Sequence, residues 1–259
     1  KRSHLTPFFM FDKFLSYLKF EKRYSAHTIN AYQRDLNDFL EYAEIEKVGD
    51  FENLSASYIR SWIVFLIEKG LKNRSVNRKL ASLRSFYKWL MKEEIVYSSP
   101  MSKVNGPKSE KHLPQFVQES ELDLSKLEKL FSNDFEGKRD ALMFELFYQT
   151  GIRLSELIGL RLEDLQPANI KVLGKRNKER IIPISNKLYI QAQEYLTLRQ
   201  EQGPDSAHLL ILDSGKKLYP AFAYRKINSY LGNITTLDKR SPHVLRHTFA
   251  THMLNRGTG

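Results

Sequence analysis

The 259-residue sequence contains no cysteine. This absence excludes a disulfide scaffold, a cysteine nucleophile and any metal site with thiolate ligands. Long apolar runs are also missing: the longest one contains Ile63 to Ile67 and is far shorter than the ~20 residues of a membrane-spanning helix. No secretory signal opens the sequence.

From these absences we expect a cytoplasmic protein without a membrane partner. Because the sequence starts with Lys1 rather than Met, we also expect residues to be missing in front of it.

Positive charge is in excess. The sequence has 41 Lys and Arg against 30 Asp and Glu, which gives a formal net charge of +11. A balance of this kind favours a polyanionic partner, most often nucleic acid. Hydrophobic residues make up 41% of the chain, which is enough to bury an ordinary core and excludes wholesale disorder.

A stretch rich in proline and serine around residues 98–114 divides the chain. Proline restricts its own backbone and that of the residue before it, so this stretch is typical of an extended linker. We predict one domain over residues 1–103, a linker over 104–116 and a second domain over 117–259.

The first domain is predicted to be all helical. Apolar residues recur at helical spacing in four segments, of which the last three cover about 25–42, 55–69 and 75–93. Ser25 is a suitable N-cap and Gly70 suits a helix end. Four helices with short connections predict a small helical bundle.

The second domain is predicted to be mixed but mostly helical. Ser125 and Glu128 fit a capping box. Further helices are expected over 138–149 and from about Arg153, Lys187 and Ser241. Apolar residues that alternate on both sides of a polar segment, 174–178, predict a β-hairpin. The fold class is therefore expected to be mainly α, with a small β-hairpin or sheet in the second domain.

Eight basic residues and no acidic residue lie between Lys69 and Lys92. Most of them fall on the fourth predicted helix, opposite its apolar stripe. Such a face suits a polyanion, and each phosphate contact on duplex DNA contributes about −0.9 to the salt slope of binding. A solvated basic face is the alternative explanation.

Arg153 follows Gly151 at the expected start of a helix. Free N–H groups and the helix dipole favour an anion there, and a guanidinium can hold two phosphate oxygens. An ordinary surface arginine is the alternative. Glu156 lies three residues later and either orients Arg153 or forms a simple intrahelical ion pair with it.

Two further motifs suit phosphate chemistry. Lys175, in the expected hairpin turn, could give a proton to a leaving oxygen, although lysines in such turns are often only solubilising and Lys178 and Arg180 are nearby competitors. His243 and Arg246 are three residues apart, so they share a helix face and could address one phosphate together.

No metal site is expected around these histidines. Zinc sites use three or four ligands, and the carboxylate or cysteine partners are absent from this part of the sequence. From their positions alone, His247 and His252 are expected to pack or to form hydrogen bonds within the fold.

Taken together and in this order, the motifs resemble those of the tyrosine recombinase (phage integrase) family, most closely its Xer-type bacterial members. The resemblance rests on segments 150–157, 174–183 and 242–252. The first half adds Ser25-x-x-Thr28 with Tyr32-x-x-Asp35-Leu36, and Leu83-Arg84-x-Phe86-Tyr87.

The resemblance implies roles for individual residues. The first domain would be the family's core-binding domain and the second its catalytic domain. Arg153 and Arg246 would hold the scissile phosphate, Lys175 would protonate the departing 5′ oxygen, and His243 would be a general base and phosphate ligand. Glu156 and His247 would support them. No metal or other cofactor would be needed.

It also implies the partners. The protein would act on double-stranded DNA at a specific recombination site, through a 3′-phosphotyrosyl intermediate and a Holliday junction. Four protomers would assemble on two sites, as a homo-tetramer or as a hetero-tetramer with a second recombinase. Expected DNA contacts are Arg34, Lys72, Arg74, Asn77, Arg78 and Arg84.

The sequence departs from the family pattern at its end. The family's tyrosine nucleophile lies on a further helix past Gly257, and no tyrosine follows Arg246 here. Tyr219, Tyr224 and Tyr230 precede it and lie outside the nucleophile's sequence context. The segment is therefore expected to bind DNA without cleaving it, with its C-terminal tail truncated or left out. A type IB topoisomerase and a non-catalytic DNA-binding regulator on the same fold remain alternatives.

Overall fold

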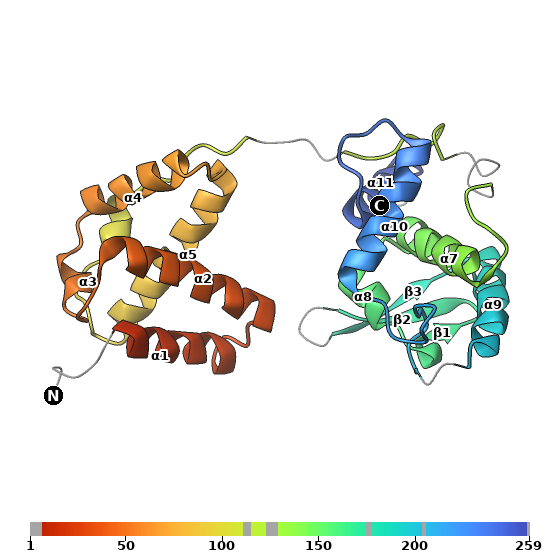
Figure 1. Ribbon diagram of the computed structural model, residues 1–259, viewed down its shortest axis with the longest axis horizontal. Helices are drawn as coiled ribbons and strands as arrows, with labels where there is room; N and C mark the ends of the chain where they lie inside the picture. Colours follow the sequence, from red (N-terminus) through yellow and green to blue (C-terminus); the bar gives the residue numbers. More distant parts are fainter. Residues whose placement is uncertain (1–6, 111–114, 123–128, 175–177, 204–205, 258–259) are drawn as a thin grey trace. The chain divides into compact units, whose positions relative to one another are not determined.

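The computed structural model describes residues 7–110, 115–122, 129–174, 178–203 and 206–257. The chain divides into two compact units, residues 1–111 and 112–259 (Figure 1). Each unit has a hydrophobic core of its own. Within the described ranges, no helix has the length and hydropathy that crossing a bilayer requires.

The described elements of the first unit are all helical. The four predicted helices are α1 (Pro7–Phe20), α2 (Ala26–Ala43), α4 (Ala56–Glu68) and α5 (Asn73–Lys92). Ser25 caps α2 as predicted, because its hydroxyl accepts a hydrogen bond from the backbone N–H of Thr28 at 3.3 Å. Helix α3 (Asp50–Asn53) and the 3₁₀ helix η1 (Pro100–Lys103) were not predicted, because they are too short to show a helical period.

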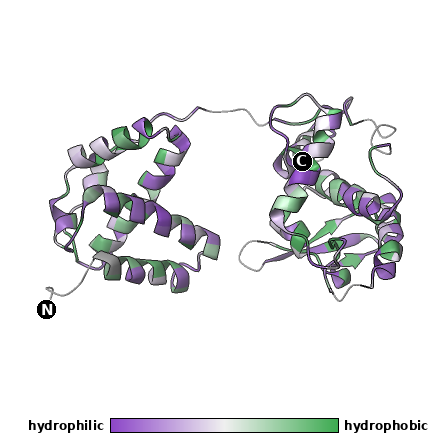
Figure 2. Cartoon of the chain, viewed as in Figure 1, coloured by the Kyte–Doolittle hydropathy of each residue, from purple (hydrophilic) through white to green (hydrophobic). Residues whose placement is uncertain are grey.

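Aromatic side chains fill the core of the first unit. Phe14 and Phe86 are fully buried with their ring centroids 5.2 Å apart, and Phe11 meets Phe86 edge to face at 4.7 Å. Such pairs add to the stability that burial alone provides. Figure 2 shows that each helix carries both apolar and polar residues, as expected for helices packed around a core.

A buried carboxylate ties α2 to α5. Asp35 is 1% exposed and accepts hydrogen bonds from Arg78, from Ser82 at 2.8 Å and from Lys79 at 3.5 Å. Lys79 also pairs with Asp38 and is itself buried. The basic residues of α5 are therefore not all on a solvated face, because Lys79 satisfies charges inside the bundle.

The second unit packs helices around a small sheet (Figure 1). Its described helices are α7 (Phe135–Thr150), α8 (Leu154–Gly159), α9 (Asn186–Glu201), α10 (Pro220–Ile234), α11 (Pro242–Asn255) and the 3₁₀ helix η2 (Leu162–Asp164). The sheet is antiparallel, in the order β1 (Leu165–Gln166), β2 (Asn169–Leu173), β3 (Glu179–Pro183).

Strands β2 and β3 form the predicted hairpin. Ile170 pairs with Ile182 and Val172 with Arg180, and the Ile170 and Val172 side chains are fully buried. The two-residue strand β1 was not predicted, because it is too short to show an alternating pattern. The capping box expected at residues 125–128 lies outside the described residues.

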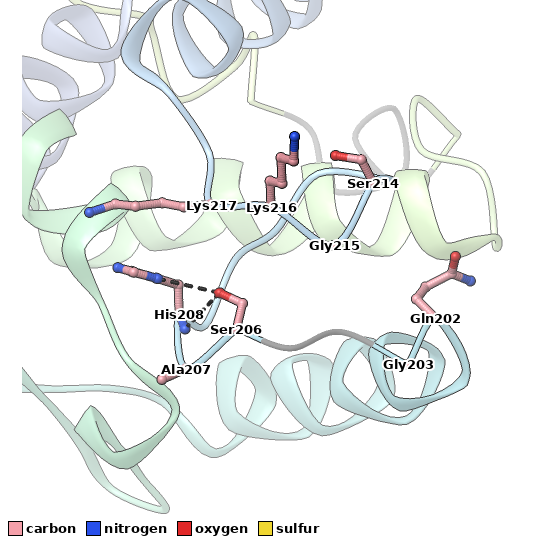
Figure 3. A pocket seen from close by; sticks show the side chains of 9 residues that line it. All are labelled: Gln202, Gly203, Ser206, Ala207, His208, Ser214, Gly215, Lys216 and Lys217. Atoms are coloured by element: carbon pink, nitrogen blue, oxygen red, sulfur yellow. Dashed lines mark hydrogen bonds between the residues drawn. The ribbon is translucent and has the colours of Figure 1, made fainter.

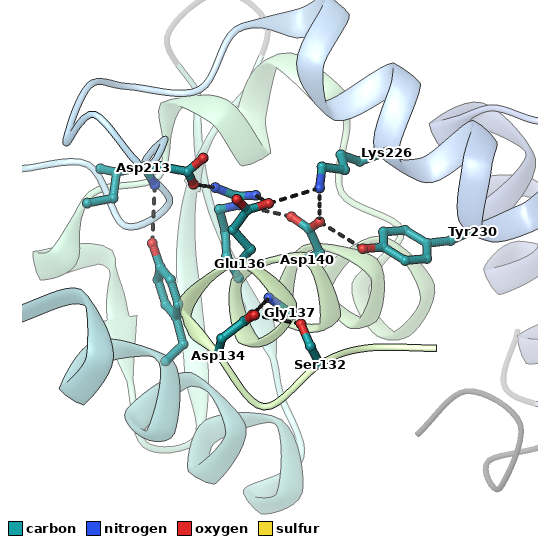
Figure 4. A network of polar contacts seen from close by, with 11 residues as sticks. Ser132, Asp134, Glu136, Gly137, Asp140, Asp213, Lys226 and Tyr230 are labelled. Atoms are coloured by element: carbon teal, nitrogen blue, oxygen red, sulfur yellow. Dashed lines mark hydrogen bonds and ion pairs between the residues drawn. The ribbon is translucent and has the colours of Figure 1, made fainter. Parts of the chain in front are cut away.

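A buried ionic network joins α7 to α10 (Figure 4). Asp140, on α7, is fully buried and accepts hydrogen bonds from Arg139 at 2.9 Å and from Tyr230 at 2.8 Å. Lys226 lies 2.9 Å from the same carboxylate, and Arg139 also donates to Asp213. Buried charges are stable only when they are paired, so the network fixes α10 against α7.

Candidate active site

A tight turn joins α7 to α8. Helix α7 ends at Thr150, and Gly151 has a φ of +57°, in the left-handed region that glycine adopts without steric cost. Arg153 is the N-cap of α8. A Cβ on Gly151 would lie 2.4 Å from Cδ1 of Phe249, so the turn is packed closely against α11. The prediction that Gly151 ends one helix and that the next begins near Arg153 is confirmed.

The first turns of α11 bring two more predicted residues to this turn. Ser241 is the N-cap and Pro242 the first helical residue, as predicted. His243 and Arg246 follow on the same helix. The Arg246 guanidinium donates a hydrogen bond from Nη1 to the backbone carbonyl of Gly151, so α11 is bound to the turn that positions Arg153.

One pocket of about 340 Å³ brings these side chains together. Arg153, His243 and Arg246 all line it, together with Tyr224 and Arg240 from α10 and the loop before α11. Three of the four predicted catalytic residues therefore line one pocket. The fourth, Lys175, lies outside the described residues.

The charges around the pocket favour an anionic ligand. Burial, and then the positive charge of Arg153, lowers the pKa of Arg246. Two guanidiniums that disfavour each other's charge are stabilised when an anion lies between them, and both can make paired hydrogen bonds to the oxygens of a phosphate. The described pocket is therefore suited to a phosphate group.

Glu156 is bonded directly to Arg153. Its carboxylate is 4% exposed and accepts hydrogen bonds from the backbone N–H and from Nη1 of Arg153, both at 2.8 Å. Both interpretations of Glu156 therefore apply: it forms an ion pair with Arg153, and the two hydrogen bonds fix the direction of the Arg153 side chain.

Arg180, on β3, is the second partner of Glu156. It donates from Nη1 and Nη2 to the two carboxylate oxygens, each at 2.8 Å. Burial by itself would raise the pKa of Glu156, but the hydrogen bonds from Arg180 and Arg153 outweigh it and lower this pKa to about 2. From the sequence, Arg180 was expected only as a competitor of Lys175. The one sequence signal for its role is that it directly precedes Ile181 and Ile182 on a predicted strand.

The two other histidines of α11 differ from each other. His252 is buried, and its ring lies 3.1 Å from the carbonyl oxygen of Val117 and 3.3 Å from the Tyr148 hydroxyl, which confirms the predicted role within the fold. His247 is exposed and does not line the pocket. His247 therefore does not pack within the fold as its position suggested, because it lies on the face of α11 that points away from the core, and the supporting role that the resemblance implies for it stays a prediction.

The expected DNA contacts of the first unit lie on α2, at the start of α5 and along α5. Lys72, Arg74 and Arg34 are exposed, and Arg34 donates to the carbonyl of Asn30 at 3.3 Å. Arg78 and Arg84 are exposed as well, but they also bind within the unit, to the Asp35 carboxylate and, at 3.1 Å, to the Val104 carbonyl. The Asn77 amide donates to the Pro107 carbonyl at 2.8 Å.

A second pocket of this unit, of about 540 Å³, is lined by His208, Lys216 and Lys217 among others (Figure 3). Burial, and then the charge of Lys217, lowers the pKa of His208. None of the predicted catalytic residues lines this pocket. Among the described residues, no group of three or more histidine, aspartate or glutamate side chains is arranged to hold a metal ion.

Two family models match the chain. The model described as "Phage integrase, N-terminal SAM-like domain" matches residues 11–94, and the "Phage integrase family" model matches residues 119–259. A tyrosine recombinase XerC from Staphylococcus carnosus (strain TM300) is 38% identical over 252 residues, which cover 95% of this chain and 83% of the relative. The XerC of Thermodesulfovibrio yellowstonii is 38% identical over 258 residues, covering 96% and 84%.

Solved structures share the fold. A XerH site-specific recombinase bound to palindromic difH substrate has a TM-score of 0.75 at 20% identity, with 95% of this chain and 73% of that chain covered. A lambda integrase dimer bound to a COC′ core site has a TM-score of 0.72 at 15% identity, covering 97% and 71%. The predicted fold, mainly α with a small sheet, is confirmed. The chain belongs to the phage integrase family and is a tyrosine-type site-specific recombinase that acts on DNA.

Proposed function

We propose that Arg153, His243 and Arg246 bind the scissile phosphate of a recombination site, where the protein breaks and rejoins DNA by metal-independent transesterification. The observation that carries this proposal is the single pocket lined by all three side chains. Two guanidiniums there supply the positive charge that the transition state of phosphoryl transfer needs.

Each step then has a group assigned to it. A tyrosine oxygen attacks the phosphorus, and its proton passes to His243. The bond from phosphorus to the 5′ oxygen breaks, and Lys175 gives that oxygen a proton. The product is a 3′-phosphotyrosyl link, which keeps the energy of the phosphodiester so that a 5′ hydroxyl of another strand can reverse the step.

The two parts of the chain have separate tasks in this proposal. Residues 1–103 form the core-binding domain, 104–116 the linker and 117–259 the catalytic domain. The contacts expected from Arg34, Lys72, Arg74, Asn77, Arg78 and Arg84 hold the DNA backbone and leave base reading to few residues.

Four protomers exchange strands between two DNA sites through a Holliday junction, either alone or together with a second recombinase. A lambda integrase tetramer bound to a Holliday junction has a similar fold, with a TM-score of 0.73 at 14% identity. At this low identity, the similarity supports the proposal by showing that a protein of this fold can form such an assembly.

A cleavage assay tests the assignment of the site. A duplex selected for binding from a random pool is nicked beside the cleavage position, so that a covalent protein–DNA adduct accumulates with the full-length protein. We expect Arg153→Ala and Arg246→Ala to lower the rate of adduct formation by about 10²–10³-fold. An adduct formed by Arg246→Ala at the wild-type rate would show that the site is wrongly assigned.

Tyr224 provides a control, because it lines the same pocket. Tyr224→Phe removes only its hydroxyl and is expected to form the adduct at the wild-type rate. Peptide mapping of the adduct then identifies the tyrosine that carries the DNA. If that tyrosine is Tyr224, the assignment of the nucleophile to a segment after Arg246 is wrong.

A further inference from the structure

The Glu156 carboxylate is fully occupied by hydrogen-bond donors. Two come from Arg153, through its backbone N–H and its Nη1, and two from the Arg180 guanidinium, all four at 2.8 Å. A carboxylate offers about four acceptor positions, so Arg153 and Arg180 together use all of them. The guanidinium of Arg180 approaches in the two-pronged geometry that gives the strongest and most directional pairing.

Arg180 belongs to a different part of the unit from Arg153. It lies on β3 opposite Val172 of β2, whereas Arg153 caps α8. The base of the hairpin is closed by a hydrogen bond from the Gly174 N–H to the Lys178 carbonyl at 2.8 Å. A Cβ on Gly174 would lie 3.2 Å from Nη1 of Arg180, so the guanidinium is also held between the hairpin and Glu156.

Arg180 does not reach the phosphate pocket itself. Arg153, His243 and Arg246 line that pocket, and Arg180 is absent from its lining. Both terminal nitrogens of Arg180 are bonded to Glu156. Its hydrogen bonds therefore reach the pocket through Glu156 and Arg153, while its positive charge also acts on Arg246.

We propose that Arg180 is a positioning residue for the recombination reaction: by fixing both oxygens of Glu156, it sets the direction in which Arg153 presents its guanidinium to the scissile phosphate. The inference rests on the proposed function of Arg153. It extends the site by a residue on the sheet that makes no contact with the substrate.

The physical reason is the division of one negative charge between two cations. With Arg180 in place, Glu156 is shared, and Arg153 keeps positive charge for the phosphate. Without Arg180, the only remaining donors to the carboxylate are those of Arg153, so the ion pair tightens and the guanidinium turns from the pocket. A displacement of about 1 Å in a site of this kind costs up to about 10²-fold in rate.

Single-turnover cleavage of the nicked duplex by full-length protein tests the proposal. Arg180→Gln is expected to lower the cleavage rate by about 10-fold or more at saturating DNA. Its Kd for DNA and the salt dependence of that Kd should stay those of the wild type. Lys171→Gln is the matched control, because Lys171 is an exposed cation on β2 of the same hairpin and pairs with Asp164 and Glu179 rather than with Glu156. It should cleave at the wild-type rate.

The dependence of the cleavage rate on pH separates positioning from a general loss of structure. In the wild type, Glu156 stays charged throughout the working range, because Arg180 and Arg153 hold its pKa low against burial. Arg153, Arg180 and Arg246 are the charged groups that act on it. Loss of Arg180 should raise the pKa of Glu156, and protonation of Glu156 then releases Arg153 from the tightened ion pair. The cleavage rate of Arg180→Gln relative to that of the wild type should therefore rise as pH falls from about 8 to about 5, and adding Glu156→Gln should abolish this change.

Each outcome decides the question. Wild-type cleavage by Arg180→Gln overturns the proposal. A weaker Kd together with a salt slope reduced by about 0.9 also overturns it, because Arg180 would then contact a phosphate directly. If Arg180→Gln does not fold, Arg180→Lys keeps the charge without the two-pronged geometry and should still cleave several-fold more slowly, whereas cleavage at the wild-type rate would contradict the proposal.

The same assay distinguishes this inference from the proposed function. If Arg153→Ala and Arg246→Ala cleave as the wild type does, the proposed site itself is wrong. If those two variants fail to cleave and the Arg180 variants cleave normally, only the positioning role of Arg180 is wrong.

Discussion

The Arg246 guanidinium donates a hydrogen bond to the backbone carbonyl of Gly151, 95 residues earlier in the chain. This bond joins the start of α11 to the turn between α7 and α8. Because Arg153 follows that turn directly, the position of one arginine depends on the other. The geometry of the turn is therefore a structural requirement of the proposed site.

Gly151→Ala tests how closely this turn is packed. The φ of +57° and the 2.4 Å approach to Phe249 both oppose a side chain. We expect a loss of about 1–3 kcal/mol in the free energy of unfolding. Gly159→Ala is the control, since no atom lies within 4 Å of its added Cβ. Urea unfolding followed by circular dichroism measures both variants, and equal stabilities would contradict the packing argument.

Glu156→Gln should destabilise the second unit in a pH-dependent way. In the folded protein the pKa of Glu156 is about 2, below its ordinary value of 4.5, so the charged form is the one that folding stabilises. The benefit is present in full above about pH 4.5 and is lost as pH falls towards 2. The variant should be less stable than the wild type by about 3 kcal/mol near neutral pH.

Urea unfolding of the two proteins at a series of pH values checks this. Their difference in free energy of unfolding should shrink steadily below about pH 4.5. A difference that stays constant down to about pH 3 would show that the Glu156 charge is not what stabilises the fold.

Asp35→Ala should destabilise the first unit strongly. Asp35 is buried, and its loss leaves Lys79 with only the partly exposed Asp38 as a partner. Breaking a buried pair from one side costs about 3 kcal/mol or more. Asp38→Ala, in which a 51% exposed side chain is removed, should cost about 1 kcal/mol or less. Both tryptophans, Trp62 and Trp89, lie in this unit, so their fluorescence follows its unfolding. Equal losses in the two variants would contradict the assigned burial.

The salt dependence of DNA binding tests the basic start of α5. Lys72 and Arg74 are exposed, and each lost phosphate contact should reduce the slope of log K against log salt by about 0.9. Asn77→Ala should leave the slope unchanged, because Asn77 carries no charge and its amide binds Pro107 and Ser109. Lys47→Ala, at an exposed lysine outside the basic run, is the charge-matched control. If Lys72→Ala and Lys47→Ala gave equal slopes, Lys72 would not contact the DNA backbone.

Sequence reasoning was most successful where the signal was local. The cap at Ser25, the helix start at Ser241 and Pro242, the break at Gly151 and the β2–β3 hairpin each depend on a few neighbouring residues, and each was confirmed. The approach of Arg246 to Gly151 was not predictable from spacing, because the tertiary packing of α11 on α7 determines it. Resemblance to the family grouped Arg153, His243 and Arg246 before their positions were known.

The roles of Arg180 and Lys79 were not predicted, and for the same physical reason. Arg180 and Glu156 are 24 residues apart, on a strand and a helix, so no period in the sequence connects them. Lys79 is spaced like a solvated residue of α5, yet it is buried because Asp35 and Asp38 face it from α2. In both cases a long-range ion pair decides the role of a basic side chain.

A structure of the full-length protein on its selected DNA site tests the central claim most directly. The account predicts that the Arg153 and Arg246 guanidiniums and the His243 ring all lie within hydrogen-bonding distance, about 3 Å, of oxygens on one and the same phosphate. If the two arginines bind different phosphates, or face a part of the pocket that no DNA enters, the account is contradicted.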